Sequence, residues 1–263
     1  MSDLQYNGRI QAVHVLFTSA RLQNDVLAVR QGLPFGARYG AVLIGPDISL
    51  PGGTTNNPPA AAGLIWSTQA GPGRPNVTFV QDLNFSWKRG HLVNGEWSGP
   101  GQWDNMTPLT PGDNSNHKTV EQYMRNFCQA SLNYDATGPY KPAWYGIAYL
   151  VQCSTDPWAA VPANADLYSY APAFIRVSWR AVRIPKPNLP PTRIQAYLDG
   201  YNGFPTVPVL PFQAPARPGA IGGACVPLGN VAGGPVFPYG GFYGPYPAAQ
   251  ANGFDGQIEI HQN

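Results

Sequence analysis

The sequence predicts an α+β domain built on a central antiparallel sheet, followed by an extended C-terminal region rich in proline and glycine. Charged residues make up only 11% of the 263 residues, against about 25% in an average domain, which excludes coiled coils, helical bundles and highly charged tails. Several short apolar segments have the composition or alternation of strands, whereas only one segment keeps a helical period. The 29 prolines and 30 glycines favour a domain rich in strands and loops.

Strands are predicted in both the N-terminal and the central part of the chain. Residues 76–87 alternate over much of their length, which predicts a strand or hairpin arm with one buried face. Residues 174–184 alternate as well, with Arg176, Arg180 and Arg183 on the face that we expect to be exposed to solvent. The predicted strands cover residues 11–17, 39–44, 76–87, 144–151 and 174–184.

The clearest helix of the chain is predicted over residues 115–134. Apolar side chains such as Val120 and Met124 recur there at helical spacing, which places them on one buried face. Asn114 or Ser115 can cap the first turn, because both residue types favour the N-cap position. The sequence therefore predicts one long amphipathic helix among the central strands.

Three regions follow from these patterns. Residues 1–70 hold strands and loops, and we expect them to belong to the same sheet as the core. Residues 71–185 form the core itself. Residues 186–263 hold many prolines, glycines and aromatic residues without a sustained period. That composition fits a disordered tail, but its aromatic content favours an ordered, extended wrap that packs on the body or on a partner.

Charge, cysteines and hydrophobicity limit the function classes. A formal net charge of +2 is too mild to indicate a nucleic-acid binder by electrostatics alone, so a polyanion would need a local basic patch. Cys128, Cys153 and Cys225 have neither the spacing of a zinc site nor the density of a disulfide framework. No apolar run approaches the roughly 20 residues of a membrane-spanning helix, and no N-terminal signal peptide is visible. We expect a soluble protein made in the cytoplasm, with any export by a route that needs no such peptide.

A constellation suited to phosphodiester hydrolysis lies between residues 87 and 121. His91 follows a predicted strand, and a neutral imidazole can take a proton from water as a general base. Arg89 stands beside it and can grip a phosphate through charge-assisted hydrogen bonds. Asn114 opens the predicted helix, where an oxygen ligand can hold a hard cation that neutralises charge on the phosphate. Glu121 lies seven residues later, nearly two helical turns, so that it shares a face with Asn114.

The constellation resembles the DNA/RNA non-specific endonucleases of the ββα-metal, or His-metal finger, class. Their signature runs Asp-Arg-Gly-His, then Asn-hydrophobic-x-Pro-Gln, then an Asn nine residues after the first Asn, and then a helical Glu. The chain departs from it at Lys88, where the family has Asp, and at Leu109, where the family has Gln. The resemblance is close over residues 87–121 and loose over residues 75–185. The matching residues are Arg89, Gly90, His91, Asn105, Met106, Thr107, Pro108, Asn114 and Glu121.

The resemblance implies a ββα-metal nuclease centre and a role for each matched polar residue. His91 would be the general base, and Arg89 would contact phosphate. Asn114 would be the direct protein ligand of Mg²⁺ or Mn²⁺, an ion that keeps most of its waters. Glu121 would order those waters, and Asn105 would brace the connecting loop.

Further residues are candidates for supporting or substrate-binding roles. His117 lies near the face of Asn114 and is either a second ligand, a proton donor to the leaving group or a solvated first-turn histidine. Arg176 and Arg180 belong to the basic strand face, which is either a groove for phosphates or an ordinary solvated surface. Lys88 replaces the family's Asp, and this change alters the support of the histidine. A degenerate, inactive site is therefore an alternative interpretation.

We therefore expect a metal-dependent endonuclease that hydrolyses DNA, RNA or both without strong sequence preference. Its context would be a toxin or effector delivered by a secretion or contractile injection system, with an immunity protein or an apparatus component as a partner. One alternative is a non-enzymatic structural or interaction protein with a degenerate nuclease-like fold, and a weaker one is a surface- or carbohydrate-binding module. An endonuclease requires His91, Arg89 and Asn114 to converge on one open cleft, whereas a structural protein would have that cleft filled.

Overall fold

The structure is a computed structural model, and it describes the parts of the chain that carry the sheet, the long helix and the hairpin before that helix. The predicted strand at residues 76–87 lies outside the described residues. The described residues are 4–6, 13–15, 29–30, 33–34, 39–45, 88–97, 99, 105–154, 172–186, 188–189, 193, 205, 207–218, 225–228 and 252–262.

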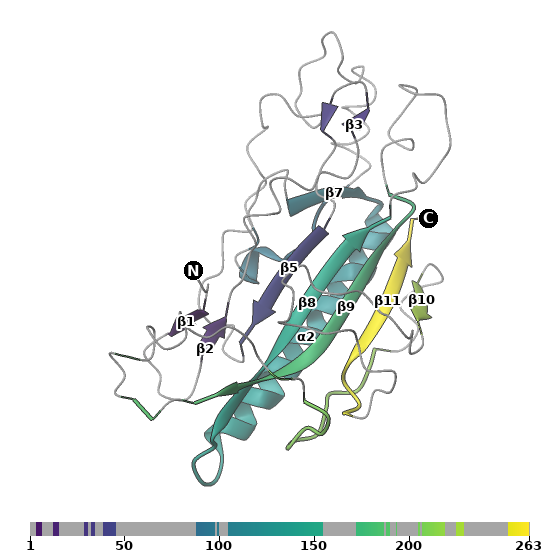
Figure 1. The fold of residues 1–263 in the computed structure, drawn as a ribbon. Helices are drawn as coiled ribbons and strands as arrows, with labels where there is room; N and C mark the ends of the chain where they lie inside the picture. The colour runs from purple at the N-terminus through teal and green to yellow at the C-terminus, as the bar shows by residue number, and fades with distance from the viewer. Residues whose placement is uncertain are drawn as a thin grey trace.

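A five-stranded antiparallel sheet forms the centre of the described structure (Figure 1). Its strands, in order across the sheet, are β10 (Cys225–Leu228), β11 (Gly256–His261), β9 (Phe174–Pro185), β8 (Ala143–Cys153) and β5 (Tyr39–Ile44). The longest pairing joins β8 to β9, with Ala143 opposite Pro185 and Cys153 opposite Ile175. β5 pairs with β8, so this part of the N-terminal region lies in the same sheet as the core.

The C-terminal strand β11 is internal to this sheet. It pairs with β9 on one side, where Ile258 lies opposite Val177, and with β10 on the other. Ile258 and Ile260 are buried, while Gln257 and Glu259, which alternate with them, are partly exposed; this is the pattern of a strand with one face in the core. The region expected to be an extended wrap therefore contributes two strands to the sheet.

The helix α2 (Pro111–Ala136) packs along one face of the sheet (Figure 1). It begins four residues earlier than predicted, because its N-cap is Thr110 rather than Asn114 or Ser115. The Thr110 hydroxyl accepts a hydrogen bond from the Asp113 N–H at 3.2 Å. The proline that follows Thr110 occupies the first helical position, where its missing N–H has no partner to lose.

The hydrophobic core lies between α2 and the sheet. The rings of Phe127 and Phe254 stack with 3.9 Å between centroids, and Tyr123 meets Trp179 edge to face at 5.9 Å. Burial of these large aromatic side chains contributes most of the hydrophobic stabilisation at this face. Other buried members of the core are Val120, Met124, Cys128, Ile147, Tyr149, Val151, Ile175, Val177 and Ala181.

A β-hairpin leads directly into the helix. Its strands, β6 (Lys88–His91) and β7 (Met106–Leu109), pair in antiparallel fashion with His91 opposite Met106. A short 3-10 turn, Gly95–Trp97, lies between the two strands, and both strands contact α2. This segment of the chain therefore has the order strand, strand, helix.

Two smaller pairs of strands are described near the N-terminus. β1 pairs with β2, and β3 pairs with β4, all in antiparallel fashion. The bounds of these strands are Leu4–Tyr6 (β1), Val13–Val15 (β2), Val29–Arg30 (β3) and Leu33–Pro34 (β4).

Together these elements confirm an α+β domain with a central antiparallel sheet. In the described parts of the chain, no helix combines the length and the apolar character needed to cross a membrane.

Candidate active site

The hairpin and the first half of α2 bring several predicted site residues into one region. His91 ends β6, and Asn105 directly precedes β7. The helix carries Asn114, His117 and Glu121 at intervals of three and four residues, so these three lie along one side of it. The candidate site is therefore built from a strand end, a loop and one side of a helix.

Asn105 holds the loop that follows β6. Its side-chain oxygen accepts a hydrogen bond from the Val93 N–H at 3.0 Å, and its side-chain nitrogen donates to the Val93 carbonyl at 2.9 Å. In addition, the Leu92 N–H donates to the Asn105 carbonyl at 2.8 Å. The side-chain amide of Asn105 therefore makes the two hydrogen bonds that a strand partner would make with Val93, just where the hairpin opens.

Two side-chain contacts tie the same loop to α2. Asn94 donates a hydrogen bond from Nδ2 to Oε2 of Glu121 at 2.7 Å, and Glu96 forms an ion pair with Arg125. Glu121 is buried, and burial raises its pKa to about 7, against the opposing effects of the Asn94 hydrogen bond and the Arg125 charge. Glu121 is therefore buried and engages the loop.

His117 is buried and bonded to a core tyrosine. Its Nε2 lies 2.7 Å from the Tyr149 hydroxyl, which reaches it from β8. Burial, and to a smaller extent the neighbouring His91, lowers the pKa of His117 to about 4. The imidazole is therefore neutral near pH 7. The structure corrects the view of His117 as a solvated first-turn histidine, because α2 begins one turn earlier and buries residue 117 against the sheet.

His91 has the chemistry of a base at this site. Its Nε2 is shielded from solvent and has no hydrogen-bond partner among the described residues. Burial lowers the pKa of His91 below its usual value. His91 also lies close enough to His117 to depress the pKa of that residue. A neutral imidazole with an uncommitted nitrogen is what general-base catalysis requires.

The remaining residues of the predicted constellation are placed less closely together. Asn114 lies in the first turn of α2 with a partly exposed side chain, and its N–H bonds to the Thr110 carbonyl at 3.0 Å. Lys88 is exposed at the start of β6. Arg89 lies opposite Pro108 in the hairpin, and its side chain is outside the described part of the structure. The predicted convergence of Arg89, His91 and Asn114 on a cleft therefore also lies outside the described residues.

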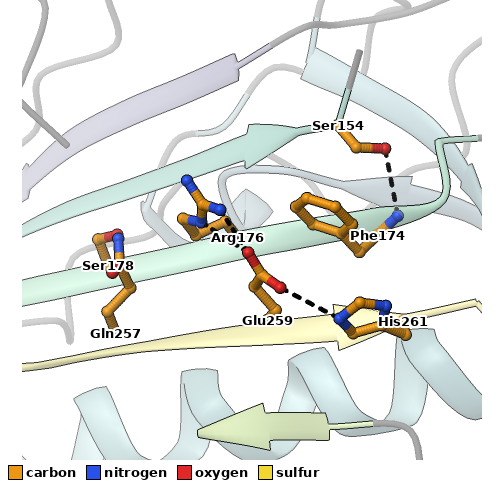
Figure 2. Close-up of polar contacts among 7 residues, drawn as sticks. All are labelled: Ser154, Phe174, Arg176, Ser178, Gln257, Glu259 and His261. Atoms are coloured by element: carbon orange, nitrogen blue, oxygen red, sulfur yellow. Dashed lines mark hydrogen bonds and ion pairs between the residues drawn. The ribbon is translucent and has the colours of Figure 1, made fainter. Parts of the chain in front are cut away.

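The two candidate arginines of β9 do not join this site. Ile175 and Val177 point into the core, so Arg176 and Arg180 lie on the face of the sheet opposite α2. Figure 2 shows Arg176 beside Glu259 of β11, where its Nε donates to Oε1 at 3.0 Å. Arg180 is buried, and its charge acts on the carboxylate of Asp255.

The structure corrects the expected basic face at Arg180, which is buried. The charge of Arg176 is neutralised by Glu259, which also lies 3.1 Å from the His261 ring nitrogen (Figure 2). Arg180 is only 2% exposed and cannot line an open groove for phosphates. Arg176 keeps a side chain that is 37% exposed and pairs with Glu259, whereas Arg180 is withdrawn from solvent.

Three residues that contact the candidate site or its supporting segments are not indicated by the motif in the sequence. Asn94 follows His91 by three residues, and that proximity in the loop was the available signal. Tyr149 occupies a position of an apolar strand that faces the helix, where a hydroxyl needs a buried partner. Gln262 bonds to the backbone on both sides of Leu109, and no local pattern in the sequence indicates this contact.

The donor set suits an ion that is held mainly by water. Among the described residues, no group of three or more His, Cys, Asp or Glu side chains is arranged to hold a metal ion. The resemblance implies a different arrangement, in which one amide oxygen, that of Asn114, binds the ion directly. A partly exposed amide at a helix start fits Mg²⁺, which keeps several of its waters.

A scan against models of known protein families finds no match, and a search of curated proteins finds no significant relative. The functional assignment therefore depends on the chemistry and placement of the residues themselves.

Proposed function

We propose that this chain is a metal-dependent, non-specific endonuclease that hydrolyses phosphodiester bonds in DNA, RNA or both. The observation that carries the proposal is the segment from β6 to α2, which brings His91 within electrostatic reach of His117 and places Asn114 one turn earlier on the same helix. The order strand, strand, helix supports a ββα-metal centre in this segment. The resemblance of residues 87–121 to that class of nucleases supports the same chemistry.

His91 acts as the general base in this proposal. Its lowered pKa keeps the imidazole neutral, and its Nε2 has no partner among the described residues. In this proposal the neutral imidazole of His91 accepts the proton of a water molecule as the water oxygen attacks phosphorus. Asn105 contributes by fixing Val93, which holds the end of the strand that carries His91.

Asn114 is the residue that would hold Mg²⁺ or Mn²⁺. When bound, such an ion supplies positive charge that stabilises the negative charge developing on the phosphate and the leaving oxygen. Arg89, two residues before the base, adds a second positive charge for the phosphate. Glu121 supports the site through its hydrogen bond with Asn94, which fixes the loop after His91.

Digestion of plasmid DNA and total RNA by the purified protein tests this proposal. We expect cleavage with Mg²⁺, no cleavage with EDTA, and loss of at least about two orders of magnitude in rate in His91→Ala, the typical contribution of a general base. The control is Tyr140→Ala, because Tyr140 is 67% exposed and lies beyond the C-terminal end of α2, outside the candidate site. Its cleavage rate should stay close to that of the unmodified protein.

Two results would contradict the proposal. Cleavage that survives His91→Ala unchanged would assign the activity to another site or to a contaminant. A folded protein that cleaves neither DNA nor RNA with Mg²⁺ or Mn²⁺ would exclude a nuclease.

A specific observation favours a second candidate function, that of a non-enzymatic interaction or structural protein. His117 and Glu121 are buried, and their polar atoms already bond to Tyr149 and Asn94. In such a protein the cluster would only stabilise the hairpin against the helix. The variants His91→Ala and Glu121→Gln would then change stability while every preparation remained inactive on nucleic acids.

The proposed nuclease activity suggests a role as a toxin or effector. A nuclease without sequence preference damages any cell that contains it, which fits a toxin or effector delivered by a secretion or contractile injection system. The producing cell would then need an immunity protein or sequestration in the apparatus. Copurification of the active protein with a partner that abolishes its cleavage would support this context.

A further inference from the structure

Gln262, just after β11, bonds to the chain segment that joins the hairpin to the helix. Its side-chain nitrogen donates to the Pro108 carbonyl at 2.8 Å, and its side-chain oxygen accepts from the Thr110 N–H at 2.9 Å. Gln262 is only 7% exposed. The residues in contact are more than 150 positions apart in the sequence, so these bonds fix the relative placement of two distant parts of the fold.

The geometry of these bonds is that of a strand neighbour. A carbonyl and the N–H two residues later point to the same side of an extended chain, and a parallel strand bonds to that pair. Gln262 offers the same acceptor and donor from one side-chain amide. It therefore takes the place of a strand on the edge of β7 that faces away from β6.

The same contact completes the cap of α2. In a capping box, the N-cap side chain bonds to the N–H three residues on, and the side chain there bonds back to the N-cap N–H. Thr110 makes the first of these bonds with Asp113. The N–H of Thr110 bonds instead to Gln262, so the second half of the cap comes from the C-terminal strand.

The backbone of Gln262 is itself bonded to the central sheet. Its backbone N–H donates to the Ala173 carbonyl at 3.0 Å, directly after β11 pairs with β9. The backbone of Gln262 is thus fixed to the sheet, and its side-chain amide bonds to the residues at the start of α2. Gln262 therefore links the position of the sheet to the position of the helix start. Asn114 lies one turn beyond this point, and His117 lies two turns beyond it.

We propose that Gln262 is a positioning residue, which sets the angle between β7 and α2 and so the placement of Asn114 and His117 relative to His91. The inference rests on the proposed nuclease function for its catalytic consequence. Its structural part, the control of the β7–α2 junction by the C-terminal strand, is testable without any activity.

Three variants of the full chain test this inference. Gln262→Met keeps the length of the side chain and removes both polar groups. Gln262→Glu keeps the acceptor for the Thr110 N–H and removes the donor to the Pro108 carbonyl. The matched control is Gln257→Met on β11, which loses a single hydrogen bond to the Ser178 hydroxyl (3.0 Å, Figure 2).

Amide hydrogen exchange and histidine NMR titration provide the readout that does not depend on function. We expect Gln262→Met to speed exchange of the Thr110 amide about tenfold, which corresponds to the loss of one hydrogen bond, and to shift the titration of His91. Gln262→Glu should restore protection of the Thr110 amide, and Gln257→Met should change neither quantity. Unchanged Thr110 exchange in Gln262→Met, or an equal change in Gln257→Met, would overturn the inference.

Cleavage kinetics provide the second readout. We expect Gln262→Met to lower kcat about tenfold with little change in KM, because misplacement of the reacting groups affects the chemical step. A KM effect with unchanged kcat would overturn the catalytic part of the inference. If the unmodified protein cleaves nothing, the proposed function fails by itself, and hydrogen exchange alone decides whether Gln262 positions the junction.

Discussion

The imidazole of His117 and the phenol of Tyr149 are hydrogen-bonded inside the core, with 2.7 Å between Nε2 and the hydroxyl oxygen. Burial lowers the pKa of the first group to about 4 and raises the pKa of the second well above its usual value. Both groups are therefore neutral near pH 7, and the bond joins α2 to β8 without a charge. The neutral pair of His117 and Tyr149 thus lies at the bottom of the candidate site. The Trp97 ring of the hairpin loop also contacts Tyr149.

Removal of the Tyr149 hydroxyl should destabilise the protein. Tyr149→Phe keeps the ring in the core but leaves His117 Nε2 buried without its partner. We expect a loss of about 1–3 kcal/mol in the free energy of unfolding, measured by urea denaturation. Tyr140→Phe is the control, since Tyr140 is 67% exposed and its hydroxyl is hydrated, and its stability should stay within about 0.5 kcal/mol of the unmodified protein.

Glu121 should make stability fall as pH rises. Its pKa is about 7 in the folded protein and 4.5 in its unperturbed state, so between these values the folded state holds a proton that the unfolded chain has lost. Its contribution to stability is therefore complete below pH 4.5 and is lost as pH rises through 7. Glu121→Gln removes this dependence, and relative to the unmodified protein it should gain roughly 2–3 kcal/mol between pH 4 and pH 8.

The pH dependence of Glu121→Gln is measured by urea unfolding at several pH values. His117 titrates in the unmodified protein and the variant alike, so its effect cancels in the difference. Gln122→Ala is the control, because Gln122 is exposed on the same helix and carries no titratable group. A difference between Glu121→Gln and the unmodified protein that stays constant with pH would contradict the prediction.

Asn105 should be difficult to replace. Asn105→Leu leaves both the N–H and the carbonyl of Val93 buried without their side-chain partner. We expect a loss of about 2–3 kcal/mol in the free energy of unfolding. Asn126→Leu removes a comparable amide from an exposed position of α2, where it bonds to Gln122, and should have little effect. Equal losses in the two variants would show that the loop does not depend on Asn105.

The buried ion pair between Lys186 and Asp135 should show strong coupling. Each side chain is 3% exposed, and the lysine nitrogen also lies 5.3 Å from the centre of the Trp144 ring. Lys186→Met should cost about 3–5 kcal/mol, because it leaves the Asp135 carboxylate buried without its cation. The double variant Lys186→Met with Asp135→Leu should recover most of that loss. Additive losses in a double-mutant cycle would contradict this prediction.

The sequence predicts the parts of the fold that depend on local periodicity. The helix and the two long central strands are predicted within a few residues, because their apolar side chains repeat at 3.6 or 2 positions. The helix start is missed, since Asn114 and Ser115 are good caps in isolation. Thr110 followed by Pro111 is the cap that the tertiary structure selects.

The C-terminal strand is missed for a different reason. Proline and glycine dominate the composition of residues 186–263 and suggest an extended chain. The short alternation of Ile258 and Ile260 with polar neighbours is a strand signal, but at six residues it is weak beside that composition. Its pairing with β9 depends on contacts some 80 positions away, which local patterns do not encode.

The candidate site is predicted by residue type but not by environment. Histidine, asparagine and glutamate at the right spacing indicate a shared location, and His91 does lie beside His117. Their burial is set by Tyr149 and Asn94, which contact them from other elements. Periodicity shows which side of a helix a residue occupies, whereas the partner across the interface is a property of the whole fold.

The internal position of β11 governs how this chain can fold during synthesis on the ribosome. β9 and β10 both precede β11 in the sequence, yet neither can pair on its inner edge until residues 256–261 have emerged. A nascent chain that stops before residue 256 therefore exposes the unpaired edge of β9 and lacks the cap that Gln262 gives to α2. During translation, the hairpin and the helix are therefore complete before β11 is available to fix how they pack against the sheet.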